Sequence, residues 1–187
     1  MSEKETEAKL QALWQRGCHF LGSRTAILGG AMSWVSDRNL VSAISNAGGF
    51  GVLACGAMTP ELLTVEIAKT QAMTNKPFGV NLITMHPELE VLINVCMEAS
   101  VTHVVLAGGV PGAGSISKIK KAGIKTICFA PALAMAKRMI KNGADALIIE
   151  GAEAGGHIGP VATIVLAQEI LPHITDVPIF VAGGISR

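Results

Sequence analysis

Short apolar runs alternate with amphipathic stretches along almost the whole chain. Seven apolar runs predict strands, at residues 25–28, 51–54, 78–82, 103–107, 125–129, 145–150 and 178–182. Six stretches of helical periodicity lie between them, beginning near residues 37, 60, 87, 115, 132 and 163. This alternation predicts a parallel sheet, and helices covering its faces explain why most of the strands are apolar throughout.

The repeated strand–helix unit favours a TIM (β/α)8 barrel over an open Rossmann sheet. A Rossmann fold predicts G-x-G-x-x-G after the first strand and an acidic residue at the end of the second. Here the first position reads Gly29-Gly30-Ala31-Met32, and the second strand ends in Ala54-Cys55-Gly56. We therefore predict an α/β TIM barrel represented by about seven βα units, with its C-terminal part missing. Residues 1–24 are expected to form a polar helical segment, and residues 25–187 the barrel domain.

The loop after the sixth strand interrupts the regular period of the repeat. Successive strands are roughly 21 to 27 residues apart, but the last interval is about ten residues longer. The excess is the segment 150–160, which carries two carboxylates, several glycines and His157. A histidine titrates near neutral pH and can transfer protons, and long loops often carry function. On this loop alone, an idle histidine in a flexible surface loop stays an open alternative.

Composition narrows the class of protein. Half of the 187 residues are hydrophobic, 16% are charged, and the net charge is +1 without a basic run, which argues against a nucleic-acid partner. The acidic N-terminus lacks the apolar region of a signal peptide. The uncharged segment 39–60 contains four glycines and polar residues, so we interpret it as buried helix, turn and strand, not a membrane span. The four cysteines lack metal-ligand spacing, which favours buried free thiols in a reducing cytosol and hence a cytoplasmic protein.

In TIM barrels the active site lies at the C-terminal ends of the strands. These ends are almost uncharged and rich in glycine, and no two His, Cys or carboxylate residues stand at ligand spacing, so no metal site is expected. Glycine lets backbone approach a flat ligand closely. Gly183-Gly184 follows the seventh strand, where barrels commonly bind phosphate through backbone N–H groups. A flat ligand that carries a phosphate favours flavin mononucleotide (FMN).

Six motifs occur in order: Ile27-Leu28-Gly29-Gly30-Ala31-Met32, Ala47-Gly48-Gly49-Phe50-Gly51, Pro77-Phe78-Gly79-Val80-Asn81-Leu82, Gly143-Ala144-Asp145-Ala146, Glu153-Ala154-Gly155-Gly156-His157 and Ala182-Gly183-Gly184-Ile185. With these motifs, residues 25–187 resemble the nitronate monooxygenase (2-nitropropane dioxygenase) family, which also contains the flavin-dependent enoyl-ACP reductase II. The resemblance implies an FMN-dependent TIM barrel.

The resemblance also implies a role for each matching residue. It implies that His157 is the catalytic histidine and that nine residues bind the cofactor. Gly30, Ala31 and Met32 would lie beside the isoalloxazine ring, and Asn81 and Glu150 would make polar contacts with FMN. Gly155 and Gly156 would lie in the adjacent loop, and Gly183 and Gly184 would bind the phosphate. Plainer interpretations stay open for three of them. Asn81 could satisfy backbone groups at a strand end, Glu150 could be an ordinary strand-terminal carboxylate, and Met32 could fill the core.

Other polar residues are expected to be structural or at the surface. This applies to His19, His86, His103 and His173, while Glu153 is expected to face solvent or to order its loop.

The expected reaction is oxidation of a nitronate or nitroalkane by oxygen through FMN. His157 would then act as the base for a nitroalkane or as a hydrogen-bond donor to a nitronate. The alternative is an enoyl-ACP reductase of fatty-acid synthesis, with NAD(P)H as the electron donor. A non-catalytic flavin-binding barrel is a second alternative, and a phosphate-binding isomerase would need a second clear acid/base residue. The expected partners are a small-molecule substrate (nitronate or enoyl thioester) and oxygen, without a membrane or nucleic acid, and a homodimer stays an open alternative.

Overall fold

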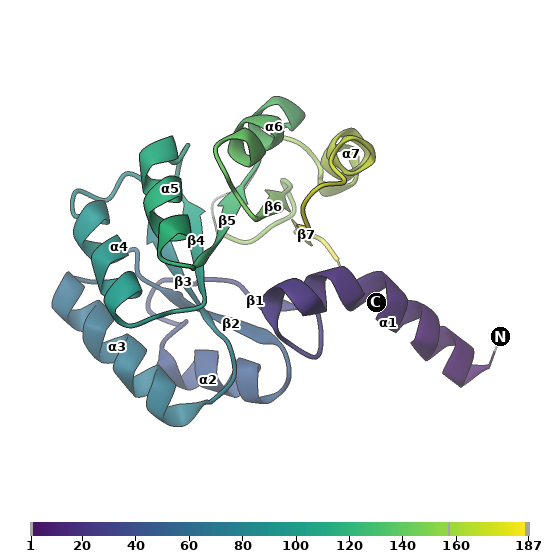
Figure 1. The fold of residues 1–187 in the computed structure, drawn as a ribbon. Helices are drawn as coiled ribbons and strands as arrows, with labels where there is room; N and C mark the ends of the chain where they lie inside the picture. Colours follow the sequence, from purple (N-terminus) through teal and green to yellow (C-terminus); the bar gives the residue numbers. More distant parts are fainter. Residues whose placement is uncertain (1, 157, 186–187) are drawn as a thin grey trace.

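The strands form one parallel sheet that curls into an incomplete barrel (Figure 1). The computed structural model describes residues 2–156 and 158–185. Each strand pairs in parallel with its neighbour in sequence, so that the order across the sheet is β1 to β7. The strands are β1 (Leu28–Gly29), β2 (Phe50–Ala54), β3 (Gly79–Ile83), β4 (His103–Ala107), β5 (Lys125–Phe129), β6 (Ala146–Glu150) and β7 (Ile179–Ala182).

Helices α2 to α7 cover the outer face of this sheet (Figure 1). They are α2 (Arg38–Asn46), α3 (Pro60–Met73), α4 (Leu89–Glu98), α5 (Ala113–Lys121), α6 (Leu133–Lys141) and α7 (Thr163–Ile170), with α7 followed by a 3-10 turn at Leu171–His173. The predicted TIM-barrel architecture with seven βα units is confirmed. In the part of the chain that the structure describes, no helix is long and apolar enough to cross a lipid bilayer.

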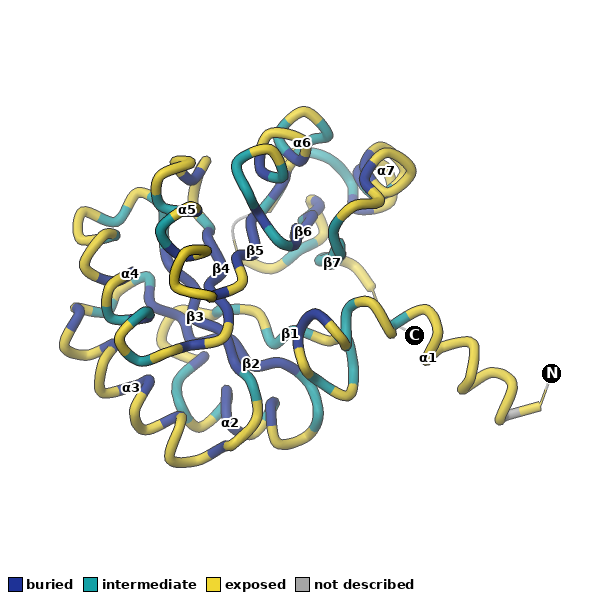
Figure 2. The backbone as a smooth tube through the Cα atoms, in the orientation of Figure 1, coloured by how far each residue is buried: buried dark blue, intermediate teal, exposed yellow. Residues whose placement is uncertain are grey.

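The sheet separates two apolar cores. The inner core lies within the curl of the sheet and includes Phe50, Val52 and Val105. The outer core lies between sheet and helices, and Leu53 and Val80 contribute to it. Successive side chains of a strand point to opposite faces, so an apolar run is required wherever both faces are buried. Figure 2 shows the strands as mostly buried, while the outward surfaces of the helices are exposed.

Helix α1 (Glu3–Leu21) closes the N-terminal end of the barrel and lies within the polar helical segment predicted over residues 1–24. Its first turns stand away from the barrel and are exposed (Figures 1 and 2). Its last residues, Phe20 and Leu21, are buried in the inner core. The Phe20 carbonyl accepts hydrogen bonds from Nε2 of His103 (3.0 Å) and from Nζ of Lys125. The helix extends because tertiary contacts hold its C-terminal turn.

The N-terminus of α2 differs from the prediction by one residue. The helix begins at Arg38 and not at residue 37, and the Asp37 carboxylate caps it by accepting the N–H groups of Asn39 (2.9 Å) and Leu40 (3.1 Å). The Ser36 hydroxyl is engaged elsewhere, in the loop that follows β1. The predicted start of a helix near residue 60 is confirmed, since Pro60 is the first residue of α3, and Thr59 caps the helix.

Candidate cofactor and active site

All strands run parallel, so their C-terminal ends lie at one end of the half-barrel, here called the mouth. Ala54 of β2 is in register with Asn81 of β3, and Glu150 of β6 is in register with Ala182 of β7. The turns that follow β1, β6 and β7 carry the remaining predicted site residues. The structure therefore brings the described members of the predicted site to one end of the fold.

The turn after β1 is exposed but held in place from beneath. Ser36 is only 4% exposed, and its hydroxyl donates to the Gly30 carbonyl (2.9 Å) and accepts from the Met32 N–H (3.0 Å). A Cβ atom at Gly30 would have no neighbour within 4 Å. The Met32 side chain is 48% exposed, so the interpretation of Met32 as core filler is wrong. This turn presents accessible backbone at a fixed position.

Asn81 lies inside the barrel, close to the mouth. It is only 7% exposed, and it alternates along β3 with Val80 and Leu82, which pack in the outer core. Its backbone carbonyl accepts from the N–H of Cys55 (3.2 Å), but no described residue hydrogen-bonds to its side-chain amide. A nearly buried amide without a protein partner loses free energy unless a ligand or water binds it. This unpaired amide fits a ligand with polar edge atoms, such as a flavin.

Glu150 ends β6 and is half-buried. It lies two residues after Ile148, on the same face of the strand, and Ile148 belongs to the inner core, so the carboxylate projects to the inner side of the curled sheet. The following loop is folded against the start of α7 and not loose. Gly151 packs directly on Thr163, and the Ala152 N–H donates to the Val161 carbonyl (2.8 Å).

Glu153 anchors the same loop to α7. Its carboxylate accepts the backbone N–H (2.7 Å) and the hydroxyl (2.8 Å) of Thr163. These bonds, the N–H first, lower the pKa of Glu153 from its usual value because they stabilise the ionised carboxylate. The prediction that Glu153 orders its loop is confirmed, and the interpretation of the segment as a flexible surface loop is wrong for its first half.

The two glycine pairs near the mouth differ in their surroundings. A Cβ atom at Gly155 or Gly156 would meet no atom within 4 Å, so this part of the loop is open to a ligand. By contrast, a Cβ atom at Gly183 would come within 2.7 Å of the Ala154 nitrogen, and one at Gly184 within 2.9 Å of a Glu153 carbon. Close packing therefore explains the second pair, and phosphate binding there stays a prediction. His157, the predicted catalytic residue, lies outside the described residues.

Two features of the mouth were missed by the sequence reasoning. Trp34 is 85% exposed and adopts a positive φ of 67°, which a bulky residue rarely does. The Thr84 hydroxyl is buried without a hydrogen-bond partner, beneath the backbone of Gly109. A polar residue two positions after the predicted strand 78–82 could have drawn attention to Thr84. No local pattern indicates the backbone conformation of Trp34.

The other predictions about single residues concern regions away from the mouth. His103 is 2% exposed at the opposite end of the barrel, where it packs edge-on against the rings of Phe20 and Phe50. Its expected structural role is confirmed.

Burial raises the pKa of Cys55, Cys96 and Cys128 to about 12, so these thiols stay protonated. Within the described ranges, no group of three or more His, Cys, Asp or Glu residues could hold a metal ion.

The fold and the mouth together define the class of protein. It is a parallel (β/α) barrel whose mouth is lined by glycine-rich turns. The family model described as nitronate monooxygenase matches residues 18–92 and 89–187, so the chain belongs to this family of flavin-dependent oxidoreductases.

Relatives with several activities share this fold. A 5-hydroxy-7a-methyl-1-oxo-octahydro-1H-indene-4-carboxyl-CoA dehydrogenase of Rhodococcus jostii is 38% identical over 164 residues, which are 88% of this chain and 46% of the relative. A nitronate monooxygenase of Paraburkholderia phytofirmans is 28% identical, over 88% of this chain and 58% of the relative. The structure of FabK from Thermotoga maritima superposes with a TM-score of 0.87 at 38% identity, covering 91% of this chain and 54% of that one. The chain spans about half the length of these relatives.

Proposed function

We propose that this chain forms the FMN-binding barrel of an oxidoreductase that acts on an acyl thioester. The observation that carries the flavin part is the almost uncharged, glycine-lined mouth with the unpaired amide of Asn81. A flat, mostly apolar ring system with polar edge atoms suits both features. When bound, FMN supplies transfer of two electrons to or from a substrate.

In this proposal each predicted residue acts through binding or position. Backbone at Gly30, Ala31 and Met32 lies against the ring system, and Asn81 and Glu150 face its polar atoms. Gly155 and Gly156 leave room beside the cofactor, because nothing stands where their side chains would be. The N–H groups of Gly183 and Gly184 bind the phosphate, as the position after β7 and the resemblance suggest.

The thioester is proposed from the relatives. The two matches at 38% identity are a carboxyl-CoA dehydrogenase and FabK, whereas the nitronate monooxygenase is 28% identical. This favours the reductase-type alternative over the nitronate oxidation that we first expected from sequence. Nitronate oxidation remains a second candidate, supported by the family model and by a nitroalkane oxidase from Streptomyces ansochromogenes with a TM-score of 0.83 at 27% identity.

His157 is proposed as the residue that moves or holds the proton. In thioester chemistry its imidazole would protonate or deprotonate the substrate carbon next to the carbonyl group, or orient the carbonyl oxygen by a hydrogen bond. In nitronate chemistry it would act as the base for a nitroalkane. The chain neighbourhood supports either role, because the loop from Glu150 to Gly156 is anchored at the mouth by Glu153.

The test uses the full-length protein reconstituted with FMN, under anaerobic conditions. If the proposal holds, NADH or NADPH bleaches the flavin absorbance, and an enoyl-CoA such as crotonyl-CoA then restores it. Bleaching by a nitronate, with no response to enoyl-CoA, would contradict the thioester proposal and support the second candidate. Absence of flavin absorbance after reconstitution would contradict both.

The cellular location, the electron donor and the assembly of the protein are also proposals. A cytoplasmic location is proposed from the free, buried cysteines. NAD(P)H as the electron donor, and a homodimer as the assembly, rest on the sequence expectations alone.

A further inference from the structure

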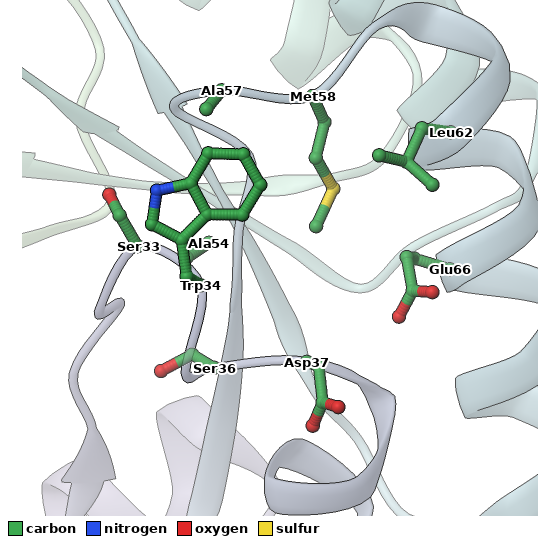
Figure 3. Close-up of a pocket in the computed structure, with 9 residues that line it drawn as sticks. All are labelled: Ser33, Trp34, Ser36, Asp37, Ala54, Ala57, Met58, Leu62 and Glu66. Carbon is green, nitrogen blue, oxygen red and sulfur yellow. The ribbon is translucent and has the colours of Figure 1, made fainter.

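A cavity of about 140 Å³ opens between the loop that follows β1 and the turn that follows β2 (Figure 3). Trp34 forms one side of it, and Met58 and Leu62 lie on the other side. Ala54 and Ala57 complete its apolar lining. No residue of this cavity is among the predicted flavin-binding residues.

The cavity borders the mouth of the barrel. Trp34 comes two residues after Met32, in the turn proposed to contact the flavin. Ala54 is in register with Asn81, and its N–H donates to the Ser36 carbonyl (3.1 Å). The cavity therefore lies beside the proposed flavin site.

The two carboxylates of the cavity wall already have partners inside the protein. The Asp37 carboxylate caps α2, and Glu66 binds both the backbone N–H and the guanidinium of Arg38. The helix N–H bonds, Leu40 first, lower the pKa of Asp37, so it stays ionised. The cavity thus offers apolar contacts to a ligand, and its two carboxylates disfavour an anionic group.

The exposure and the backbone conformation of Trp34 are typical of a ligand-binding residue. Its indole is 85% exposed, although a tryptophan gains much free energy from burial. Its φ of 67° lies in the left-handed region, where strain in a bulky residue often accompanies function. The conformation places the indole across the cavity from Met58 (Figure 3), where an occupant would cover part of the ring.

We propose that this cavity binds the aliphatic end of the acyl thioester, with Trp34 packed against it. The inference rests on the proposed function for the thioester itself. An apolar cavity of roughly 150 Å³ is known to bind benzene, so a volume of about 140 Å³ suits about six carbons. The acyl chain would extend from the reacting carbons at the mouth toward Leu62, and it would be neutral at its end.

The test measures binding of saturated acyl-CoA thioesters to the FMN-loaded, full-length protein by calorimetry. We expect octanoyl-CoA to bind at least tenfold more tightly than butyryl-CoA, because four more CH₂ groups are buried. Suberyl-CoA has the same chain length with a terminal carboxylate, and we expect it to lose this advantage. The exposed Ala57 is replaced in A57F to fill the cavity, and A113F adds the same bulk on an exposed residue of α5.

The expected result is that A57F abolishes the preference for octanoyl-CoA and A113F retains it. L62W fills the cavity from α3 and should act like A57F, which provides a second variant if the first fails to bind FMN. Equal affinity of the wild type for both thioesters, or an unchanged preference in A57F and L62W, would overturn the inference and leave the proposed function standing. Failure of every thioester to bind would overturn the inference together with the thioester function.

Discussion

The two ends of the barrel differ in how their polar groups and aromatic side chains are packed. At the closed end, Phe20 fills the inner core, and its carbonyl is bonded by His103 and Lys125. At the mouth, the Asn81 amide has no partner among the described residues, and Trp34 lies in solvent. At the closed end, side chains thus bond the Phe20 carbonyl, although the buried Thr126 hydroxyl of β5 has no partner among the described residues. At the mouth, the nearly buried Asn81 amide is left to bind a ligand. In barrels of this type, stability belongs to the first end and chemistry to the second.

The largest expected effect concerns the mouth. Replacing His157 in H157A should lower turnover by about 100- to 10,000-fold, the usual contribution of a general acid or base, while FMN remains bound. Turnover and flavin content of the full-length protein are the measurements. H173A is the matched control, since His173 is exposed after α7. Turnover that is equal in the two variants would remove His157 from the mechanism.

The closed end should show its effect in stability. Burial, more than the nearby Lys125, lowers the pKa of His103 from 6.5 to about 4. The folded protein therefore favours neutral His103, and the unfolded chain takes up the proton first. This contribution to the free energy of unfolding is complete above pH 6.5. It is lost as the pH falls toward 4, and the total loss is about 3 kcal/mol.

Denaturant unfolding at several pH values tests this asymmetry. H103Q keeps a donor for the Phe20 carbonyl but does not titrate, so its free energy of unfolding should fall less between pH 6.5 and pH 4. Parallel pH dependences of wild type and H103Q would show that His103 binds protons equally in both states. The exposed His19 gives the control variant H19Q, whose pH dependence should match the wild type.

A third comparison separates packing from ligand binding at the mouth itself. Gly183 has a φ of 109° and lies against Ala154, so G183A should lower the free energy of unfolding by about 2 kcal/mol. In G155A the new methyl group meets no atom within 4 Å, and we expect a change below about 0.5 kcal/mol. Both are measured on the apoprotein. Equal effects in the two variants would contradict the described packing of the loop.

The smallest effect concerns the anchor of that loop. E153Q weakens the acceptor for the Thr163 N–H, so this amide should exchange its hydrogen faster. Because the pKa of Glu153 is lowered on folding, its contribution is present above pH 4.5 and is lost as the pH falls through the lower folded value. Hydrogen exchange at Thr163 should follow this pH dependence in the wild type and not in E153Q. Exchange that is slower in E153Q would contradict the anchoring role.

The sequence pattern predicted the parallel fold because apolar runs and helical periods are local features. It also placed Asn81 and Glu150 at one end, since parallel strands must end together. It could not give the contacts between residues that are far apart in the sequence. Helix α1 continues to Leu21 because Phe20 meets His103, which lies far along the chain.

The first strand and the glycine pair show the same limit. The predicted strand 25–28 is Leu28–Gly29 in the structure, since β1 is an edge strand that pairs only with β2. Gly183 was interpreted as a phosphate-binding residue from its position, but its contact with Ala154 comes from the fold of another loop. Packing between loops leaves no period in the sequence, so the pattern placed the described site residues at one end of the fold but did not give their contacts with other loops.

The central claim is that the unpaired amide at the mouth binds FMN. The most direct measurement is titration of FMN into the full-length apoprotein of the wild type and of N81A, combined with apoprotein unfolding. We predict saturable FMN binding by the wild type, binding about tenfold weaker in N81A, and apoprotein stability that does not fall in N81A. Equal FMN affinity in both proteins, or a loss of stability that accounts for the weaker binding, would contradict the claim.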